Sequence, residues 1–173
     1  FDLNIDYGRD LFSGYLDINY FATKLLDRTI QDDTYGDVFF SCIGKFNSDC
    51  DNLIDYPVFD FKHRMTVGWT KGDLELQLVW KYQSALDDGD DDVEYFREKL
   101  EPYSLVDLSG RYRINDTLSL TAGAKNIFDE QPQAIGSNSW EWLREDIPTF
   151  SNTYSQYYDV FGRTFFLKLS ARF

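Results

Sequence analysis

The chain has 173 residues, enough for one domain, and carries 15 Phe, 12 Tyr and 4 Trp with a formal net charge of −13. Acidic residues outnumber basic ones 30 to 17, which argues against a nucleic-acid partner because phosphate binding requires clustered Lys and Arg. No apolar run approaches the roughly 20 residues of a membrane-spanning helix, and the first residues do not show the charged-then-apolar pattern of a signal peptide. The only methionine is Met65, so we expect Phe1 to follow a segment that was removed or to lie within a longer chain.

Apolar and polar residues alternate along seven segments, which is the two-residue period of a β-strand with one apolar face. In the first segment, for example, Phe1, Leu3 and Ile5 alternate with Asp2 and Asn4. The same pattern predicts strands at 1–7, 16–23, 59–69, 74–83, 106–113, 117–125 and 165–173. No segment shows the period of a helix, so we expect an all-β fold.

The connections between these strands alternate between short and long. Short connections fall at 9–13, 71–73 and 114–116, and long ones at 28–57, 86–101 and 127–156. Successive connections of an antiparallel sheet lie at opposite ends, so this order places every short turn at one end and every long loop at the other. Short periplasmic turns and long extracellular loops are typical of an outer-membrane β-barrel. We therefore predict an antiparallel transmembrane β-barrel segment of about seven strands.

The direction of the last strand follows from this arrangement. If the long loops are outside, the strand leaves the 127–156 loop and runs inward to the periplasmic rim. Phe173 then lies in the aromatic girdle, where a ring beside a charged carboxylate suits the interface between lipid and water.

Three stretches resemble a known family. "VDLSGRYRINDTLSLTAGAKNIFDEQPQ" and the terminal "YYDVFGRTFFLKLSARF" are similar to the carboxy-terminal part of TonB-dependent receptors, the ligand-gated active transporters of Gram-negative outer membranes, and "YPVFDFKHRMTVGWTKGDLELQLVWKY" resembles the preceding hairpin. The residues that carry the resemblance are Asp107, Leu108, Tyr112, Asn115, Asp116, Gly123, Asn126, Phe128, Asp129, Pro132, Tyr158, Asp159, Gly162, Arg163 and Phe173.

The resemblance implies a larger molecule than this chain. Family members close about 22 strands around a globular plug, and an isolated seven-strand sheet in lipid would leave two edges of unpaired backbone groups. We therefore expect residues 1–173 to be the carboxy-terminal segment of the barrel, with the plug domain and the earlier strands outside this chain. The implied location is the Gram-negative outer membrane, with lipid and lipopolysaccharide around the barrel.

The resemblance implies that the whole protein imports a ligand with an external source of energy, and that this segment catalyses no reaction. Expected partners are the plug, the remaining strands, TonB acting through the plug, and the barrel-assembly machinery, for which Phe173 and Phe165 would form the recognition signal. A ferric siderophore is the default cargo of the family, while glycans and cobalamin stay open. The alternative is a passive porin-like channel or a barrel that serves as a scaffold.

The polar face of the predicted strands carries charged residues in the middle of the strands. In a barrel they would line the lumen as a charged inner wall beneath acidic loops, which could guide an anionic ligand, although salt-bridge ladders within the wall would give the same composition. The expected wall residues are Lys62, Arg64, Glu75, Lys81, Asp107, Arg111, Arg113, Lys125, Lys168 and Arg172.

Two loops offer candidate functional residues. Cys42 and Cys50, in "SCIGKFNSDC", are close enough in sequence for a disulfide that would contribute roughly 2.5 kcal/mol, whereas a zinc site would need more ligands. In "SNSWEWLRED", Trp140, Trp142 and Arg144 could stack on a sugar or an aromatic siderophore, or the tryptophans could pack the loop against the barrel.

Little in the sequence favours a metal site or catalysis. The acidic run "DDGDDDVEYFREKLE" at 87–101 offers oxygen ligands, but its spacing does not fit a twelve-residue calcium loop, and a solvated charge run is the simpler interpretation. His63 is the only histidine, and its parity places it on the apolar, lipid-facing side, where a general base has no substrate. We predict no enzyme activity, no cofactor and no metal.

Overall fold

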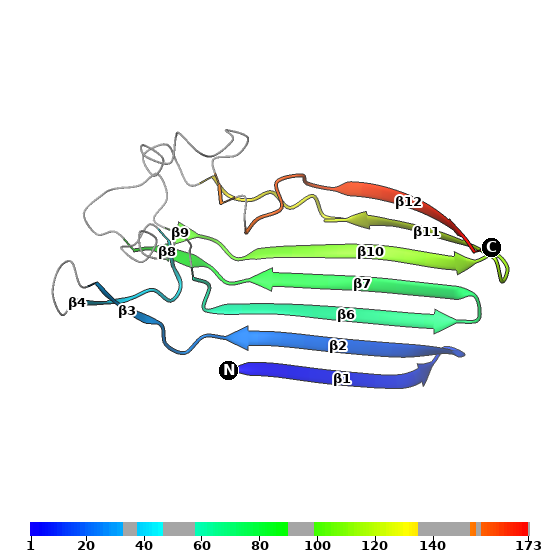
Figure 1. Ribbon diagram of the computed structural model, residues 1–173, viewed down its shortest axis with the longest axis horizontal. Helices are drawn as coiled ribbons and strands as arrows, with labels where there is room; N and C mark the ends of the chain where they lie inside the picture. The colour runs from blue at the N-terminus through cyan, green and yellow to red at the C-terminus, as the bar shows by residue number, and fades with distance from the viewer. Residues whose placement is uncertain (33–37, 47–57, 90–98, 135–152, 155–156, 173) are drawn as a thin grey trace.

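The computed structural model describes residues 1–173 except 33–37, 47–57, 90–98, 135–152, 155–156 and 173. Seven long strands form one antiparallel sheet in which neighbours in the chain are neighbours in space (Figure 1). This confirms the predicted all-β barrel segment. The strands are β1 (Asp2–Leu11), β2 (Gly14–Lys24), β6 (Phe61–Lys71), β7 (Leu74–Gln83), β10 (Tyr103–Arg113), β11 (Leu118–Lys125) and β12 (Thr164–Ala171).

Five short strands lie in the long connections, and the sequence pattern does not predict them. β3 (Thr29–Asp32) and β4 (Val38–Ser41) form a hairpin, while β5 (Lys45–Phe46), β8 (Leu86–Asp88) and β9 (Lys99–Leu100) form a separate three-stranded sheet. Elements of two to four residues are too short to show a period, so tertiary pairing decides them. Among the described residues, no helix is long and apolar enough to cross a membrane.

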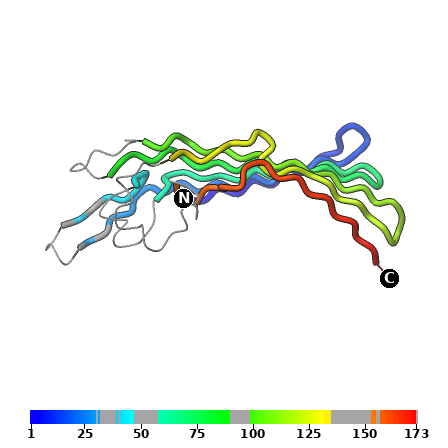
Figure 2. Tube along the Cα trace, turned by 90° about the horizontal axis from the view of Figure 1, so that it is seen from above, coloured from blue at the N-terminus to red at the C-terminus, as the bar shows by residue number. Residues whose placement is uncertain are grey.

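The short turns gather at one end of the sheet, named here the turn end, and the long connections at the other, the loop end (Figures 1 and 2). Phe12 and Ser13 form the first turn with φ of 53° and 61°, and Gly72 has φ of 55° in the second. Positive φ at such positions matches the twist of tight hairpins. In the third turn the Asn115 side-chain oxygen accepts hydrogen bonds from the Thr117 and Leu118 amides at 2.9 and 2.8 Å. The predicted sorting of the connections is therefore confirmed.

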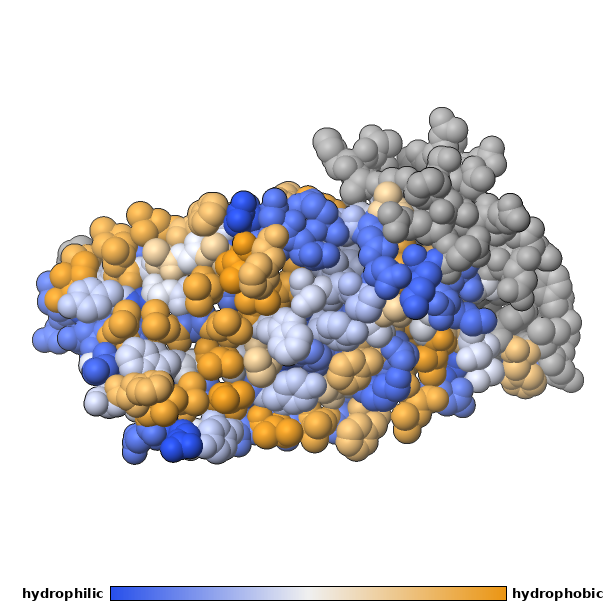
Figure 3. All heavy atoms as spheres, turned by 180° about the vertical axis from the view of Figure 1, so that it is seen from behind, coloured by the Kyte–Doolittle hydropathy of each residue, from blue (hydrophilic) through white to orange (hydrophobic). Residues whose placement is uncertain are grey.

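The strand register separates an apolar face from a polar face. Met65 pairs with Tyr20 and Trp80 on the first, and Lys62 pairs with Thr23 and Gln83 on the second. Apolar side chains (orange) cover much of the strand region in Figure 3. On β12, Phe165 and Leu167 expose 74% and 73% of their surface. Leaving such residues uncovered by protein is costly in water but favourable in lipid, which is the pattern of a membrane-facing barrel wall.

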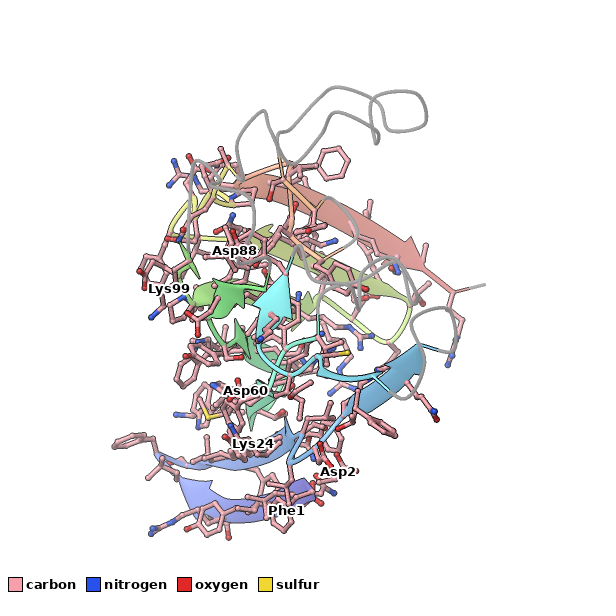
Figure 4. The ribbon with its side chains drawn as sticks, turned by 90° about the vertical axis from the view of Figure 1, so that its left-hand side faces the viewer. Phe1, Asp2, Lys24, Asp60, Asp88 and Lys99 are labelled. Atoms are coloured by element: carbon pink, nitrogen blue, oxygen red, sulfur yellow. The ribbon has the colours of Figure 1, made fainter. Side chains whose placement is uncertain are left out.

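The sheet is curved and open. Seen from its loop end in Figure 4, it forms an arc that runs from β1 to β12. Within the described residues β1 pairs only with β2, and β12 pairs only with β11. The seven strands therefore form part of a barrel wall and do not close on themselves.

Six residues form a compact hydrophobic cluster, named here the loop-end core: Phe46, Phe59, Leu86, Leu100, Tyr103 and Tyr158. Its members come from all three long connections and from the start of β10. The predicted strand at 59–69 begins too early, because β6 begins only at Phe61 and Phe59 is buried in this core. The long connections therefore pack against one another at the loop end of the sheet.

Candidate ligand site at the loop end

A cavity of about 560 Å³ opens at the loop end of the polar face, named here the loop-end cavity. β2, β6 and β7 supply its wall, and segments that precede β3, β6 and β12 supply its rim. Because alternate residues of a strand point to the same face, Lys62 and Arg64 of β6 lie beside Gln83 and Lys81 of β7. Three residues of the expected charged wall therefore come together in one cavity.

The cavity is strongly basic. Arg28, Lys62, Arg64 and Lys81 line it, and no Asp or Glu is among the described lining residues. Lys81 alone of these four forms an ion pair with a described carboxylate, at 2.8 Å from the Asp107 Oδ2 atom. A concave surface with several uncompensated cations attracts anions, and the attraction is strengthened where the walls exclude water.

Aromatic rings complete the lining. The Lys62 ammonium nitrogen lies 4.3 Å from the centre of the Phe59 ring and 5.4 Å from the centre of the Tyr157 ring. Both distances fall within the range of cation–π attraction. Phe21 of β2 also lines the cavity, as do Tyr82 of β7 and the imidazole-bearing His63 of β6. Cations beside flat aromatic faces suit a ligand that carries both negative charge and rings.

Gln83 connects the cavity wall to the segment before β12. Its side-chain nitrogen donates a hydrogen bond to the Tyr157 carbonyl at 3.2 Å. Tyr157 also packs on Phe59, with ring centres 5.8 Å apart. The polar wall and the loop-end core therefore hold Tyr157 from two sides, which fixes part of the cavity rim.

A hydrogen-bond network below the cavity holds β10 and the end of β11. Asp107 Oδ1 accepts a hydrogen bond from the Asn126 amide at 2.9 Å, while Oδ2 accepts one from Lys81. The Asn126 side chain, 1% exposed, donates to the Glu130 carbonyl at 2.8 Å and accepts from the Glu130 amide at 2.9 Å. Lys81 is thereby positioned at the cavity by a carboxylate that is itself fixed.

Lys24 and Asp60 form an ion pair at the loop end, between the end of β2 and the residue that precedes β6 (Figure 4). Burial acts to raise the pKa of Asp60, but hydrogen bonds from Lys24 and Ser84 outweigh it and leave the pKa below its usual value of 3.8. Asp60 is therefore ionised at neutral pH and compensated locally, so its charge does not cancel the cations of the cavity.

The remaining predicted site residues fall elsewhere. Arg111, Arg113, Lys168 and Arg172 lie toward the turn end of the polar face. Trp140, Trp142 and Arg144 lie outside the described residues, as do Cys50 and Phe173. Cys42 is disulfide-bonded and 1% exposed.

His63 lies among aromatic rings of the apolar face. Its ring stacks on Tyr82 with centres 5.2 Å apart and meets Trp80 edge-on at 4.4 Å. Trp80 in turn donates a hydrogen bond to the Ser104 hydroxyl at 2.7 Å. This cluster has the composition of an interfacial aromatic belt, which fits the position that parity predicts for His63.

Sequence reasoning did not single out several cavity residues. The alternation places Phe59 in a strand, and no motif marks Arg28, Gln83 or Tyr157 as a ligand contact. Only the paired aromatic residues Tyr157 and Tyr158, next to the predicted last strand, gave a signal that a packed loop segment precedes it. No group of three or more His, Cys, Asp or Glu side chains in the described ranges is arranged to hold a metal ion.

These features define an outer-membrane type of β-barrel wall with a basic cavity at its loop end. Residues 1–127 match the family described as TonB dependent receptor-like, beta-barrel. The chain belongs to this family, whose barrels are outer-membrane proteins of Gram-negative bacteria.

Similar proteins are ferric siderophore receptors. A stretch of 76 residues, 44% of this chain and 9% of the relative, is 32% identical to the ferric enterobactin receptor of Pseudomonas aeruginosa. A crystal structure of that receptor, carrying a G324V mutation, superimposes with a TM-score of 0.60 at 19% identity over 99% of this chain and 22% of the receptor chain. The ferric-catecholate import receptor Fiu from E. coli K12 gives 0.52 at 13% identity over 99% and 27%. The chain thus spans less than a third of these relatives.

Proposed function

We propose that this chain forms the carboxy-terminal part of the barrel of a TonB-dependent transporter that imports an iron complex of a catecholate siderophore. The supporting observation is the loop-end cavity, which places four cations beside aromatic residues that include Phe21, Phe59 and Tyr157, with no carboxylate among its described lining residues. An iron complex of catecholates carries negative charge around flat aromatic groups, and this lining complements both properties. The names of the similar receptors point to the same class of ligand.

In the proposed mechanism the protein binds and admits its cargo without catalysing a reaction. Cations of the loop-end cavity attract the complex from outside, and the rings of Phe21, Phe59 and Tyr157 orient it. The plug domain then blocks the lumen until TonB, drawing energy from the inner membrane, displaces it. The strands described here supply the wall and the rim of the binding site.

The test uses the full-length receptor in outer membranes with iron-radiolabelled enterobactin as the probe. Lys62→Gln and Arg64→Gln should each weaken binding by about tenfold, because each removes one charge-assisted contact. Lys99→Gln is the matched control, since it removes the same charge from an exposed β9 residue outside the cavity lining. Equal binding by all three variants would exclude the cavity as the site.

Uptake distinguishes active transport from the alternative of a passive channel. Accumulation of the radiolabelled complex should stop when a protonophore collapses the inner-membrane potential or when TonB is deleted. Uptake that continues under both conditions would instead identify a porin-like channel. Binding without any uptake would contradict the transport function and favour a scaffold or a receptor that does not transport its ligand.

A further inference from the structure

The first long connection contains the hairpin β3–β4, which stands apart from the other strands. Within the described residues β3 and β4 pair only with each other, and Figure 1 shows them beyond the loop end of the large sheet. An isolated two-stranded hairpin is only marginally stable in water, so its position depends on what holds its base. That base consists of Arg28, which precedes β3, and Cys42, which follows β4.

The base of the hairpin supplies one cation of the loop-end cavity. The Cys42 amide donates a hydrogen bond to the Arg28 carbonyl at 3.0 Å, next to the pair of Thr29 with Ser41. Of the four cations that line the cavity, Arg28 is the one that lies outside the long strands. Its charge is available to a ligand only where its backbone is held in place, because a segment that must be ordered on binding lowers affinity.

The residues after Cys42 tie this base to the cavity wall. Ile43 and Lys45 form backbone bridges with Val58. The Gly44 amide also donates to the Val58 carbonyl at 2.6 Å. Val58 is 8% exposed, lines the cavity and lies just before β6. A chain of backbone contacts therefore leads from the hairpin base through Cys42 to the wall of the cavity.

Separate contacts hold the two ends of this connection. The Leu25 amide donates to the Asp60 carbonyl at 2.8 Å, next to the end of β2. The Gly44 carbonyl accepts a hydrogen bond from the Asp87 amide at 2.7 Å. Of the described side chains between these two attachments, that of Cys42 is the buried one, 1% exposed and disulfide-bonded. Cys42 is therefore the point at which the hairpin joins the packed part of the loop end.

We infer that the Cys42 disulfide is a positioning element of the ligand site, because it holds Arg28 at the rim of the loop-end cavity. The inference rests on the proposed function in taking this cavity as the site that binds an anionic ligand. The disulfide restricts the chain around Cys42 and so orders the hairpin base before the ligand arrives. Without it, binding has to order this segment, and much of the gain in affinity from the Arg28 charge is lost.

The first test is a double-mutant cycle in the full-length receptor in outer membranes, with iron-radiolabelled enterobactin as the probe. The cysteine variant combines Cys42→Ser with Cys50→Ser, so that no free thiol remains. Arg28→Gln and the cysteine variant should each weaken binding by up to about tenfold, and all three substitutions together should weaken it little more than Arg28→Gln alone.

Arg64→Gln is the matched control for this cycle. Arg64 lies within β6, where strand pairing positions it without the hairpin, so its loss of affinity should multiply with that of the cysteine variant. Losses that multiply for Arg28→Gln as well would overturn the inference. A cysteine variant that binds as tightly as the wild type would overturn it too.

The second test is amide hydrogen exchange and needs no ligand. In the cysteine variant, the amides at positions 42 and 44 should exchange about tenfold faster or more, because the segment that contains their hydrogen bonds opens more often. The Leu25 amide, which donates to Asp60 outside this segment, is the control and should exchange as in the wild type. Unchanged exchange at positions 42 and 44 would overturn the inference. A wild-type receptor that binds no enterobactin would contradict the proposed cargo alone, and the exchange rates would then decide this inference.

Discussion

The Lys62 ammonium nitrogen lies 4.3 Å from the centre of the Phe59 ring, and this contact joins the loop-end cavity to the loop-end core. Phe59 also meets Tyr158 edge-on, with ring centres 6.2 Å apart. One side chain therefore forms a wall of the proposed ligand site and supports the packing of three connections. Binding affinity and loop stability should respond together when this residue changes.

Phe59→Ala should destabilise the loop end by about 3 to 5 kcal/mol, as is usual for the truncation of a buried aromatic residue. Hydrogen exchange at Leu86 and Leu100 should become faster, while exchange in β11 should change little. Phe59→Leu keeps most of the apolar volume and should cost less than about 1.5 kcal/mol, yet it should still weaken ligand binding because it lacks the ring. Equal exchange rates in Phe59→Ala and the wild type would contradict the role of the core.

Asn126→Ala should destabilise the barrel by about 1 to 3 kcal/mol, because it removes both hydrogen bonds between the buried Asn126 side chain and the Glu130 backbone. Asn126 also has φ of 50°, so Asn126→Gly separates the lost hydrogen bonds from backbone strain. Thermal unfolding of the full-length receptor measures both. The exposed Asn115→Ala is the control and should cost no more than about 1 kcal/mol, since water replaces its contacts. A similar loss for both variants would show that burial does not decide the cost.

The loop end should weaken in strong alkali. Burial, with a smaller contribution from nearby Tyr103, raises the pKa of Tyr158 to about 12 from its usual 10. The folded protein therefore keeps this proton while the unfolded chain loses it, so the stabilisation is complete below pH 10 and declines from pH 10 to pH 12. Tyr158→Phe should reduce that decline, as measured by hydrogen exchange of the loop-end core against pH.

The same substitution tests the buried hydroxyl at neutral pH. The Tyr158 hydroxyl has no hydrogen-bond partner among the described residues. Tyr158→Phe should therefore be neutral or slightly stabilising at pH 7. A loss of more than about 1 kcal/mol would show that the hydroxyl has a partner in the full-length receptor.

Cys42→Ser should lower the stability of the first long connection by roughly 2 to 3 kcal/mol, the usual effect of opening a short disulfide loop. Cleavage of this connection by protease should become faster, and a reducing agent should produce the same cleavage in the wild type. Adding the reductant to Cys42→Ser should change nothing further. Resistance of the variant to protease would show that packing around Cys42 is sufficient.

Phe173→Ser should lower the amount of receptor assembled in the outer membrane without changing its transcript. The expected cause is weaker recognition of the last strand by the barrel-assembly machinery. Heat-modifiable mobility on gels distinguishes assembled barrel from unassembled chain. Phe165→Leu, which keeps an apolar residue on the same face, should assemble better than Phe165→Ser.

The sequence alone was sufficient for the seven long strands, their two faces and the sorting of the connections. Alternation over ten or so residues is a strong signal because one face meets lipid and the other does not. It also placed Lys62, Arg64 and Lys81 on the same face, since parity within a strand needs no knowledge of the neighbours. Parity likewise placed His63 on the apolar face.

Only the tertiary structure decided which of those side chains share a cavity. Strand register sets Lys62 beside Gln83 and Arg113 beside Ser119, and no local pattern determines it. The loop-end core assembles residues more than a hundred positions apart, from Phe46 to Tyr158, and it buries Phe59, which the alternation places in a strand. Short strands such as β5 and β9 exist because neighbouring connections pair with one another. The wall of this barrel follows from local alternation, whereas its loop-end cavity follows from contacts between distant segments, whose formation no single stretch of sequence controls.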